Sequence, residues 1–285
     1  MHDAVGFDVA MLRLLLKTRL VGVGERLYYV PEVGSTNSLA MQLAQQRPEE
    51  GLVVLANSQT AGRGRQGRSW VDAPGSSVLS SILLRPLFPP HLLVMVASLA
   101  VVRAVVQSCG VQASIKWPND VLLDGRKLSG ILIETGHDPD GRLFAVVGIG
   151  VNVNGQLQGR VEQKGVEVEL STIATTLEMA CGSPVRREQF LADLLLAFEN
   201  DYLALQEEAT EPPGATSDEK PVARSIRERW QNALSTLGST IKVHQGDRVV
   251  EGVAEAVNDT GALLLRRPSG ELACITWGVV EHFSG

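Results

Sequence analysis

The longest helix that the sequence predicts, residues 91–109, is apolar on almost every side and ends before Gly110. A helix on the surface of a globular protein has one apolar stripe, so a helix that is apolar all round needs partners on several sides. The residues that follow favour strands, with extended runs at 114–117 and 121–123 and Asp124-Gly125 as a tight hairpin turn. We therefore expect this helix to pack across a sheet that is built largely from hairpins.

The order of the remaining elements predicts the fold class. Short apolar runs of strand type occur at 52–56, 77–84, 128–134 and 144–153, and helices are predicted at 8–20, from 36 onwards, at 187–207 and around 222–235. Helices beside consecutive hairpin strands indicate an α+β fold with a mixed, mostly antiparallel sheet flanked by helices.

The last 45 or so residues have a different pattern. Short alternating runs from Thr240 to Phe283 are separated by turns at 258–261 and 268–270. Such a meander predicts a small β-barrel of the SH3 kind. We therefore predict a large domain at residues 1–236 and a small C-terminal β-barrel domain at 237–285.

Residues 207–221, EEATEPPGATSDEKP, are acidic, contain prolines and hold almost no large apolar side chain. A segment of this composition buries too little apolar surface to offset the entropy of ordering it. We predict a mobile loop here, and the sequence assigns it no function.

Composition excludes several classes of protein. A formal net charge of −6 argues against a surface built throughout for nucleic acid, so any anion site must be local. Cys109, Cys181 and Cys274 have no CxxC spacing and are expected to be free, buried thiols in a reducing cytoplasm. The five histidines form no local ligand pair, so no metal site is predicted from side chains. The apolar run at 11–16 is too short and interrupted for a signal peptide or a membrane span, which favours a soluble, cytoplasmic protein.

One loop concentrates positive charge. Residues 62–70, GRGRQGRSW, hold three arginines and three glycines within seven positions. The loop matches G-x-G-x-x-G, but no uninterrupted helix can follow it and no Asp or Glu occurs between Asp72 and Asp120, so a dinucleotide site is not predicted. It is also neither a Walker loop nor a repeated RG segment, and three arginines that merely solvate a turn are the plain alternative. The glycine spacing favours close approach of backbone N–H groups to an oligophosphate, with guanidinium groups beside them.

A second polar cluster follows the long helix. Residues 116–120, KWPND, and 127–130, KLSG, lie on either side of the Asp124-Gly125 turn. The turn brings Lys127 back beside the strand that starts at Asp120, so two lysines, an asparagine and a carboxylate can share one site.

These motifs together resemble those of the biotin protein ligases, also called biotin-[acetyl-CoA-carboxylase] ligases. The resemblance lies in five segments in the family's order: GSTNS at 34–38, QTAGRGRQGRSW at 59–70, KWPND at 116–120, KLSG at 127–130 and GIGVN at 148–152. It covers residues 30–155 and implies a catalytic domain similar to that of class II aminoacyl-tRNA synthetases. It also implies a two-step reaction, in which biotin and ATP give biotinyl-5'-AMP with Mg²⁺ and a lysine of a biotin carboxyl carrier protein domain then takes the biotinyl group.

The resemblance also implies roles for individual residues. Biotin would be bound by Ser35, Thr36, Asn37, Gln59, Arg63, Gly64, Arg65, Lys127 and Gly130. The nucleotide would be bound by Arg63, Arg65, Arg68, Trp70, Asn119, Lys127 and Asn152. With the charge argument that follows, catalysis is expected to rest on Lys127, Arg63, Arg65, Lys116 and Asp120.

Elementary chemistry supports these assignments. Joining a carboxylate to an α-phosphate brings two anions together, so cations that neutralise both are the main requirement. The ureido ring of biotin is neutral but has donors and an acceptor that must stay paired when buried, which suits Ser, Thr, Asn and Gln. Asp120 is expected to orient Lys116 or the incoming carrier lysine.

Two alternatives stay open. A lipoate-protein ligase would use the same adenylate chemistry, although the dithiolane ring of lipoate has no ureido groups to explain the polar cluster. A biotin-responsive DNA-binding regulator would need a winged-helix domain, and residues 1–25 are too few for one, so no specific operator binding is expected. The sequence predicts no membrane partner and leaves a homodimer open.

Overall fold

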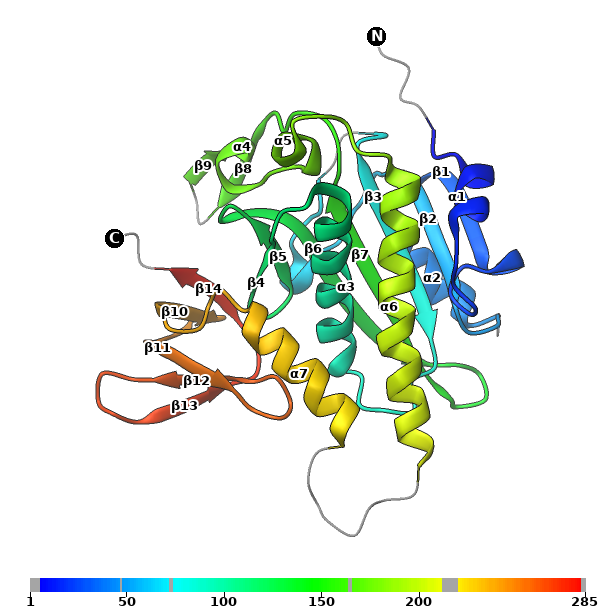
Figure 1. Cartoon of the computed structure of the whole chain (residues 1–285). Coiled ribbons are helices and arrows are strands. Elements are labelled where there is room, and N and C mark those ends of the chain that lie inside the picture. The colour runs from blue at the N-terminus through cyan, green and yellow to red at the C-terminus, as the bar shows by residue number, and fades with distance from the viewer. Residues whose placement is uncertain (1–5, 47, 72–73, 164–165, 212–219, 283–285) are drawn as a thin grey trace.

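The computed structural model describes residues 6–46, 48–71, 74–163, 166–211 and 220–282, and a seven-stranded sheet forms its centre (Figure 1). The strand order is β1-β2-β3-β7-β6-β5-β4; β1 and β2 are parallel and all other neighbours are antiparallel. The strands are β1 Leu27–Val33, β2 Leu52–Gln59, β3 Ser77–Leu84, β4 Ser114–Lys116, β5 Asp120–Leu123, β6 Arg126–His137 and β7 Leu143–Asn152. The predicted α+β fold with a mixed, mostly antiparallel sheet is confirmed.

Helices cover both faces of this sheet (Figure 1). α3 (Leu92–Cys109) and α6 (Arg187–Thr210) lie on one face over a large apolar core, and α2 (Thr36–Ala44) packs on the other face over a smaller one. Side chains of β2 alternate between the two cores, as a strand between two layers requires. α3 is long and apolar enough to cross a membrane, but 61% of it is buried inside the protein, as expected for a core helix.

Smaller elements connect these layers. A two-stranded hairpin and two short helices follow β7, and two 3-10 turns precede β1 and β3. Their bounds are β8 Arg160–Gln163, β9 Val166–Glu169, α4 Leu170–Ile173, α5 Leu177–Cys181, η1 Gly24–Arg26 and η2 Arg65–Gly67.

The predicted N-terminal helix at 8–20 is shorter in the structure. α1 spans only Val9–Leu15 and packs against α6. The backbone N–H groups of residues 19–21 donate instead to the buried Glu199 carboxylate of α6, at 2.7–2.8 Å. This carboxylate lies far away in the sequence, so the local pattern could not show where the helix stops.

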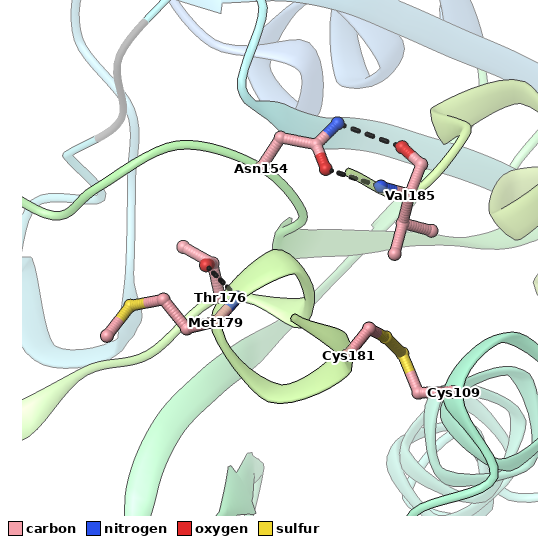
Figure 2. Close-up of a disulfide and its surroundings, with 6 residues drawn as sticks. All are labelled: Cys109, Asn154, Thr176, Met179, Cys181 and Val185. Carbon is pink, nitrogen blue, oxygen red and sulfur yellow. Dashed lines mark hydrogen bonds between the residues drawn. A yellow bond between two sulfur atoms is a disulfide. The ribbon is translucent and has the colours of Figure 1, made fainter. Parts of the chain in front are cut away.

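The prediction of three free cysteines was wrong for two of them. The C-terminal ends of α3 and α5 lie side by side, and Cys109 and Cys181 form a disulfide with their Cα atoms 5.3 Å apart (Figure 2). Cys274 is free but exposed rather than buried. The two partners are 72 residues apart, so spacing alone could not indicate that they meet. A disulfide is typical of oxidising surroundings, so these cysteines no longer support a reducing cytoplasm.

The predicted loop at 207–221 is partly helical. α6 continues to Thr210, and α7 (Pro221–Ala233) begins where the loop was expected to end. Residues 212–219, the middle of the predicted loop, lie outside the described residues. The acidic composition of residues 207–210 suggested a loop, but these residues form the last turn of α6, and Glu208 is buried there.

The C-terminal residues form a separate five-stranded antiparallel sheet in the order β13-β12-β11-β10-β14. Its strands are β10 Thr240–Gln245, β11 Arg248–Val257, β12 Leu263–Arg266, β13 Leu272–Ile275 and β14 Val279–His282. This sheet contacts the larger part through Trp117, whose indole N–H donates to the carbonyl of Gly261 at 2.9 Å. The domain boundary at residue 236 stays a prediction.

Candidate active site

On the face of the sheet that α2 covers, glycines leave space that side chains would otherwise fill. A β-carbon on Gly148 of β7 would lie 2.1 Å from Asn37 Oδ1, and one on Gly150 would lie 2.8 Å from the Trp70 ring. Only glycine therefore allows these side chains to lie against the strand. The resulting pocket is lined by Ser35, Thr36, Asn37, Gln59, Arg63, Trp70, Leu79, Ser80, Gly130, Leu132, Gly148, Ile149 and Gly150.

Neutral polar side chains gather at the start of α2. Ser35 caps the helix and accepts a hydrogen bond from the amide of Ser38, which fixes the turn that presents the next residues. The amide and hydroxyl of Thr36 donate to Gln59 Oε1 at 2.8 and 3.1 Å. The Ser81 hydroxyl donates to Asn37 Oδ1 at 2.6 Å. These side chains are held in place before any ligand arrives.

The arginine-glycine loop, residues 62–70, closes on itself as a tight hairpin. Arg63 and Ser69 form an antiparallel bridge, and the amide of Gly64 donates to the carbonyl of Arg68 at 2.7 Å. Gln66 and Gly67 have positive φ values of 57° and 71°, which turn the chain between the two arms. Because its arginines repel one another, the sequence also predicts that this loop is mobile without a ligand and ordered with one, and this stays a prediction.

A second pocket adjoins the first and holds the cationic groups. It is lined by Arg63, Gly64, Arg65, Arg68, Ser69, Trp70, Asn119, Lys127, Gly130, Ile131 and Leu132. Both pockets share Arg63, Trp70, Gly130 and Leu132, so one extended ligand can occupy both.

Each of the main cations is held by a partner. Arg65 donates to Asn119 Oδ1 at 3.0 Å, and Lys127 Nζ lies 2.8 Å from Asp120 Oδ1. Lys127 also lies 5.7 Å from the centroid of the Trp70 ring. The bulge in the pairing of β5 with β6, just after Val121, places Lys127 opposite Leu122 and within reach of Asp120.

Burial lowers the pKa of two cations in this region, Lys116 and Arg65. Desolvation lowers the pKa of Lys116, while Asp120 opposes the shift and Lys127 adds to it. Desolvation also lowers the pKa of Arg65, again opposed by Asp120. Charge crowding and burial therefore make this region favourable for an anion.

The structure brings together most of the predicted site residues. Every residue predicted to bind biotin lines one or both pockets, and so do Arg68, Trp70 and Asn119 from the predicted nucleotide site. Lys116 and Asp120 stand opposite each other on β4 and β5, next to the second pocket. Asn152 lines neither pocket: its side-chain amide donates to the carbonyl of Thr175 at 3.1 Å and, at 3.5 Å, to the backbone carbonyl of Lys127, so it supports the backbone at Lys127.

Sequence reasoning missed Ser81, Gly148 and Glu134 as functional candidates. Glu134 forms an ion pair with Arg63, with Arg63 Nη2 and Glu134 Oε1 2.7 Å apart. Gly130, Leu132 and Glu134 are two residues apart on β6, and this alternation could have placed Glu134 on the pocket face.

The arrangement suits a particular kind of chemistry. A neutral polar and apolar pocket can bind an uncharged ring, and the adjoining cations can hold a carboxylate next to a phosphate. In the part of the chain that the structure describes, no group of three or more His, Cys, Asp or Glu side chains forms a metal site.

Comparison with known proteins agrees with this arrangement. Residues 29–154 match the biotin/lipoate A/B protein ligase family, and residues 236–284 match the biotin protein ligase C-terminal domain. The chain is 35% identical to a biotin-[acetyl-CoA-carboxylase] ligase of Paracoccus denitrificans, over 83% of this chain and 92% of that protein. It is 33% identical to the bifunctional ligase/repressor of Bacillus subtilis, over 91% of this chain and 74% of that protein.

A solved structure shows the same architecture. The biotin protein ligase of Aquifex aeolicus, in complex with biotin and ATP, is 26% identical with a TM-score of 0.71, over 91% of this chain and all of that one. The fold, the two adjoining pockets and these relatives agree, and the chain belongs to the biotin protein ligase family.

Proposed function

We propose that this protein activates biotin with ATP as biotinyl-5'-AMP and transfers the biotinyl group to a lysine of a biotin carboxyl carrier protein domain. The observation that carries the proposal is the pair of joined pockets, one neutral and polar, the other rich in cations. An acyl-adenylate has the same two halves, a neutral ring at one end and a phosphate at the other.

In the first step, a carboxylate oxygen of biotin attacks the α-phosphorus of ATP. The new O–P bond forms as the bond to the β-phosphate breaks, and pyrophosphate leaves with its electron pair. Arg63, Arg65, Lys116 and Lys127 supply the positive charge that offsets repulsion between the two reacting anions. Their contacts with Asn119, Asp120 and Glu134 hold three of them in place before the substrates bind.

Magnesium is expected to enter with ATP. Mg²⁺ is usually bound through one or two carboxylates and the substrate's phosphates rather than by a cage of protein ligands. Among the described residues, Asp120 is the carboxylate that lies opposite Lys116 beside the second pocket, and it would be the side chain to approach the ion there. The ion would add charge neutralisation at the phosphates.

In the second step, the carrier lysine attacks the carbonyl carbon of the adenylate. The lysine must first lose its ammonium proton to a base; the neutral amine then forms the amide as the C–O bond to AMP breaks, and AMP leaves with the electron pair. Asp120 is the carboxylate we propose to orient this lysine and take its proton, because it lies opposite Lys116 at the edge of the second pocket.

The test is incubation with ATP, Mg²⁺, a carrier domain and either biotin or lipoate, followed by intact mass measurement of the carrier. We expect one biotinyl group on the carrier, dependent on ATP, and no lipoyl group. Lys127→Gln should abolish most of this activity, while Lys17→Gln removes an exposed lysine after α1 and serves as the control for charge. Addition of lipoyl and not biotinyl groups would refute the proposal.

Two finer expectations belong to the same proposal. We expect a cytoplasmic protein and no specific operator binding; a homodimer stays open. A salt-sensitive shift of a defined promoter fragment by the intact chain would contradict the second expectation.

A further inference from the structure

Glu134 lies on β6, on the strand face that forms the floor of the first pocket. Gly130 and Leu132, at the two preceding positions of that face, line the pocket directly. The Glu134 side chain is 23% exposed, so its carboxylate is partly shielded from water. A shielded carboxylate needs donors, and the structure provides them from two different elements.

The first donor is the arginine-glycine loop. Arg63 Nη2 lies 2.7 Å from Oε1 and Arg63 Nη1 lies 3.2 Å from Oε2, which is a two-pronged contact between a planar guanidinium and a carboxylate. Arg63 lines both pockets, and its side chain is 48% exposed. Arg63 Nη1 also donates to the Ser38 hydroxyl at 3.3 Å, but without the two-pronged contact much of the ordering of this half-exposed side chain would have to occur each time a ligand binds.

The second donor is the pocket itself. Asn37 Nδ2 donates to Glu134 Oε2 at 3.0 Å, while Asn37 Oδ1 accepts from the Ser81 hydroxyl at 2.6 Å. An amide group can be turned end for end, and only its partners decide which end faces which way. A carboxylate accepts and never donates when ionised, so Glu134 holds the NH₂ group of Asn37 toward itself, aided by a longer contact of the same group to the carbonyl of Leu132 at 3.4 Å.

Glu134 therefore joins the buried amide of the pocket to the charged loop over its mouth. We propose that Glu134 is a positioning residue for biotin binding, which acts by fixing the orientation of Asn37 and by holding Arg63 over the pocket. The inference rests on the proposed function. Order that exists before the ligand binds lowers the entropy lost on binding, so its effect falls on affinity rather than on the chemical step.

The experiment compares wild type with Glu134→Gln by calorimetric titration with biotin and by steady-state biotinylation of a carrier domain. Glutamine keeps the shape but replaces one acceptor oxygen with a donor, so either Asn37 or Arg63 loses its partner. Loss of a hydrogen bond to a charged group should raise the biotin Kd and the KM for biotin about tenfold. The kcat at saturating biotin should stay within about twofold, and amide exchange of residues 62–70 in the free enzyme should become faster.

A double-mutant comparison separates the two partners. In an Arg63→Ala background, Glu134→Gln should raise the KM for biotin by a smaller factor, because only the contact with Asn37 is left to lose. The control is Glu255→Gln, which disturbs another two-pronged contact, from Nε and Nη2 of Arg266 in the C-terminal sheet. It should leave the KM for biotin unchanged.

The outcomes distinguish this inference from the proposed function. If wild type biotinylates the carrier but Glu134→Gln matches it in biotin Kd and in loop exchange, the positioning role is wrong and the function stands. The role is also wrong if kcat falls while KM stays the same. If wild type adds no biotin, the proposed function itself fails. If Glu134→Gln lowers the melting temperature of the protein, Glu134→Asp and Glu134→Ala are compared instead. Glu134→Asp keeps the charge and should have the lower KM for biotin; equal KM values would refute the positioning role.

Discussion

At the scale of single residues, the site depends on the lack of a side chain as much as on the side chains themselves. The Asn37 amide occupies the space above Gly148 that a β-carbon would fill, and the Trp70 ring does the same above Gly150. Each of these two side chains thus has a glycine beneath it on β7. The geometry of the pocket follows from this pairing of a polar or aromatic group with a bare strand.

We expect Gly148→Ala to impair biotin binding more than folding. The added methyl group would meet Asn37 Oδ1 at 2.1 Å, so Asn37 must move and its bonds to Ser81 and Glu134 weaken. The KM for biotin should rise about tenfold or more, measured by carrier biotinylation. Gly34→Ala is the matched control, because a β-carbon there meets nothing within 4 Å. Equal KM values for the two variants would contradict the role of Gly148.

We expect the lowered pKa of Lys116 to appear in the pH profile. Burial lowers this pKa below 10.5, so Lys116 loses its charge, and the reaction loses a cation, at lower pH than with an ordinary lysine. Lys116→Arg keeps a charge at all accessible pH values, so the alkaline fall in kcat/KM should move to higher pH. An unchanged alkaline limb would show that Lys116 does not supply charge to the reaction.

The lowered pKa of Lys116 also makes the free energy of unfolding depend on pH. Between the lowered pKa and 10.5, the unfolded chain binds more protons at this residue than the folded chain does. The free energy of unfolding should therefore rise with pH in that window, because the buried ammonium no longer has to stay charged.

Motifs made most of the pocket-lining residues predictable, because each lay within a short segment of distinctive spacing. Glu134 lies outside those motifs, at the end of the predicted strand, and only its alternation with Gly130 and Leu132 on β6 points to it. Ser81 and Asn37 belong to β3 and α2, and only the folded sheet brings them to 2.6 Å. Contacts that join distant segments leave no local signal.

At the scale of elements, side chains near the end of α6 and the start of α7 cap each other's helix termini. The Glu208 carboxylate accepts from the amides of Val222 and Ala223 at 2.6 and 3.1 Å, at the start of α7. Lys220 Nζ in turn donates to the carbonyls of Glu208 and Glu211 at the end of α6. The anion lies at a helix N-terminus and the cation at a C-terminus, which are the favourable ends for each charge.

We expect Glu208→Gln to lower the free energy of unfolding by about 1 kcal/mol, because one amide of α7 loses its acceptor and the charge is removed. Glu207→Gln changes an exposed residue of the same helix turn and should have almost no effect. Urea denaturation of both variants measures the difference. Equal losses would mean that Glu208 does not cap α7.

At the scale of the whole molecule, the C-terminal sheet is tied to the active site. Trp117 lies between Lys116 and Asn119 in the chain; its amide donates to Thr236 Oγ1 and its indole to the carbonyl of Gly261. The sequence could divide the chain into two parts from their patterns. It could not show this contact, because Trp117 and Gly261 are 144 residues apart.

The last prediction uses two buried tryptophans that differ in one bond. Trp117 and Trp230 are 2% and 1% exposed, but only Trp117 has an acceptor for its indole N–H, since Trp230 Nε1 has none among the described residues. The Trp230 ring also lies beside Gly261, since a β-carbon there would be 3.7 Å from Trp230 Cζ3. Changing either tryptophan to Phe therefore removes a similar volume near the same turn, and the two variants differ in the hydrogen bond to Gly261. Trp117→Phe should speed amide exchange at 258–263 more than Trp230→Phe does, and only Trp117→Phe should lower kcat for biotinylation, because Lys116 and Asn119 lose a fixed neighbour. Matching behaviour of the two variants would mean that the C-terminal sheet does not hold the site through this bond.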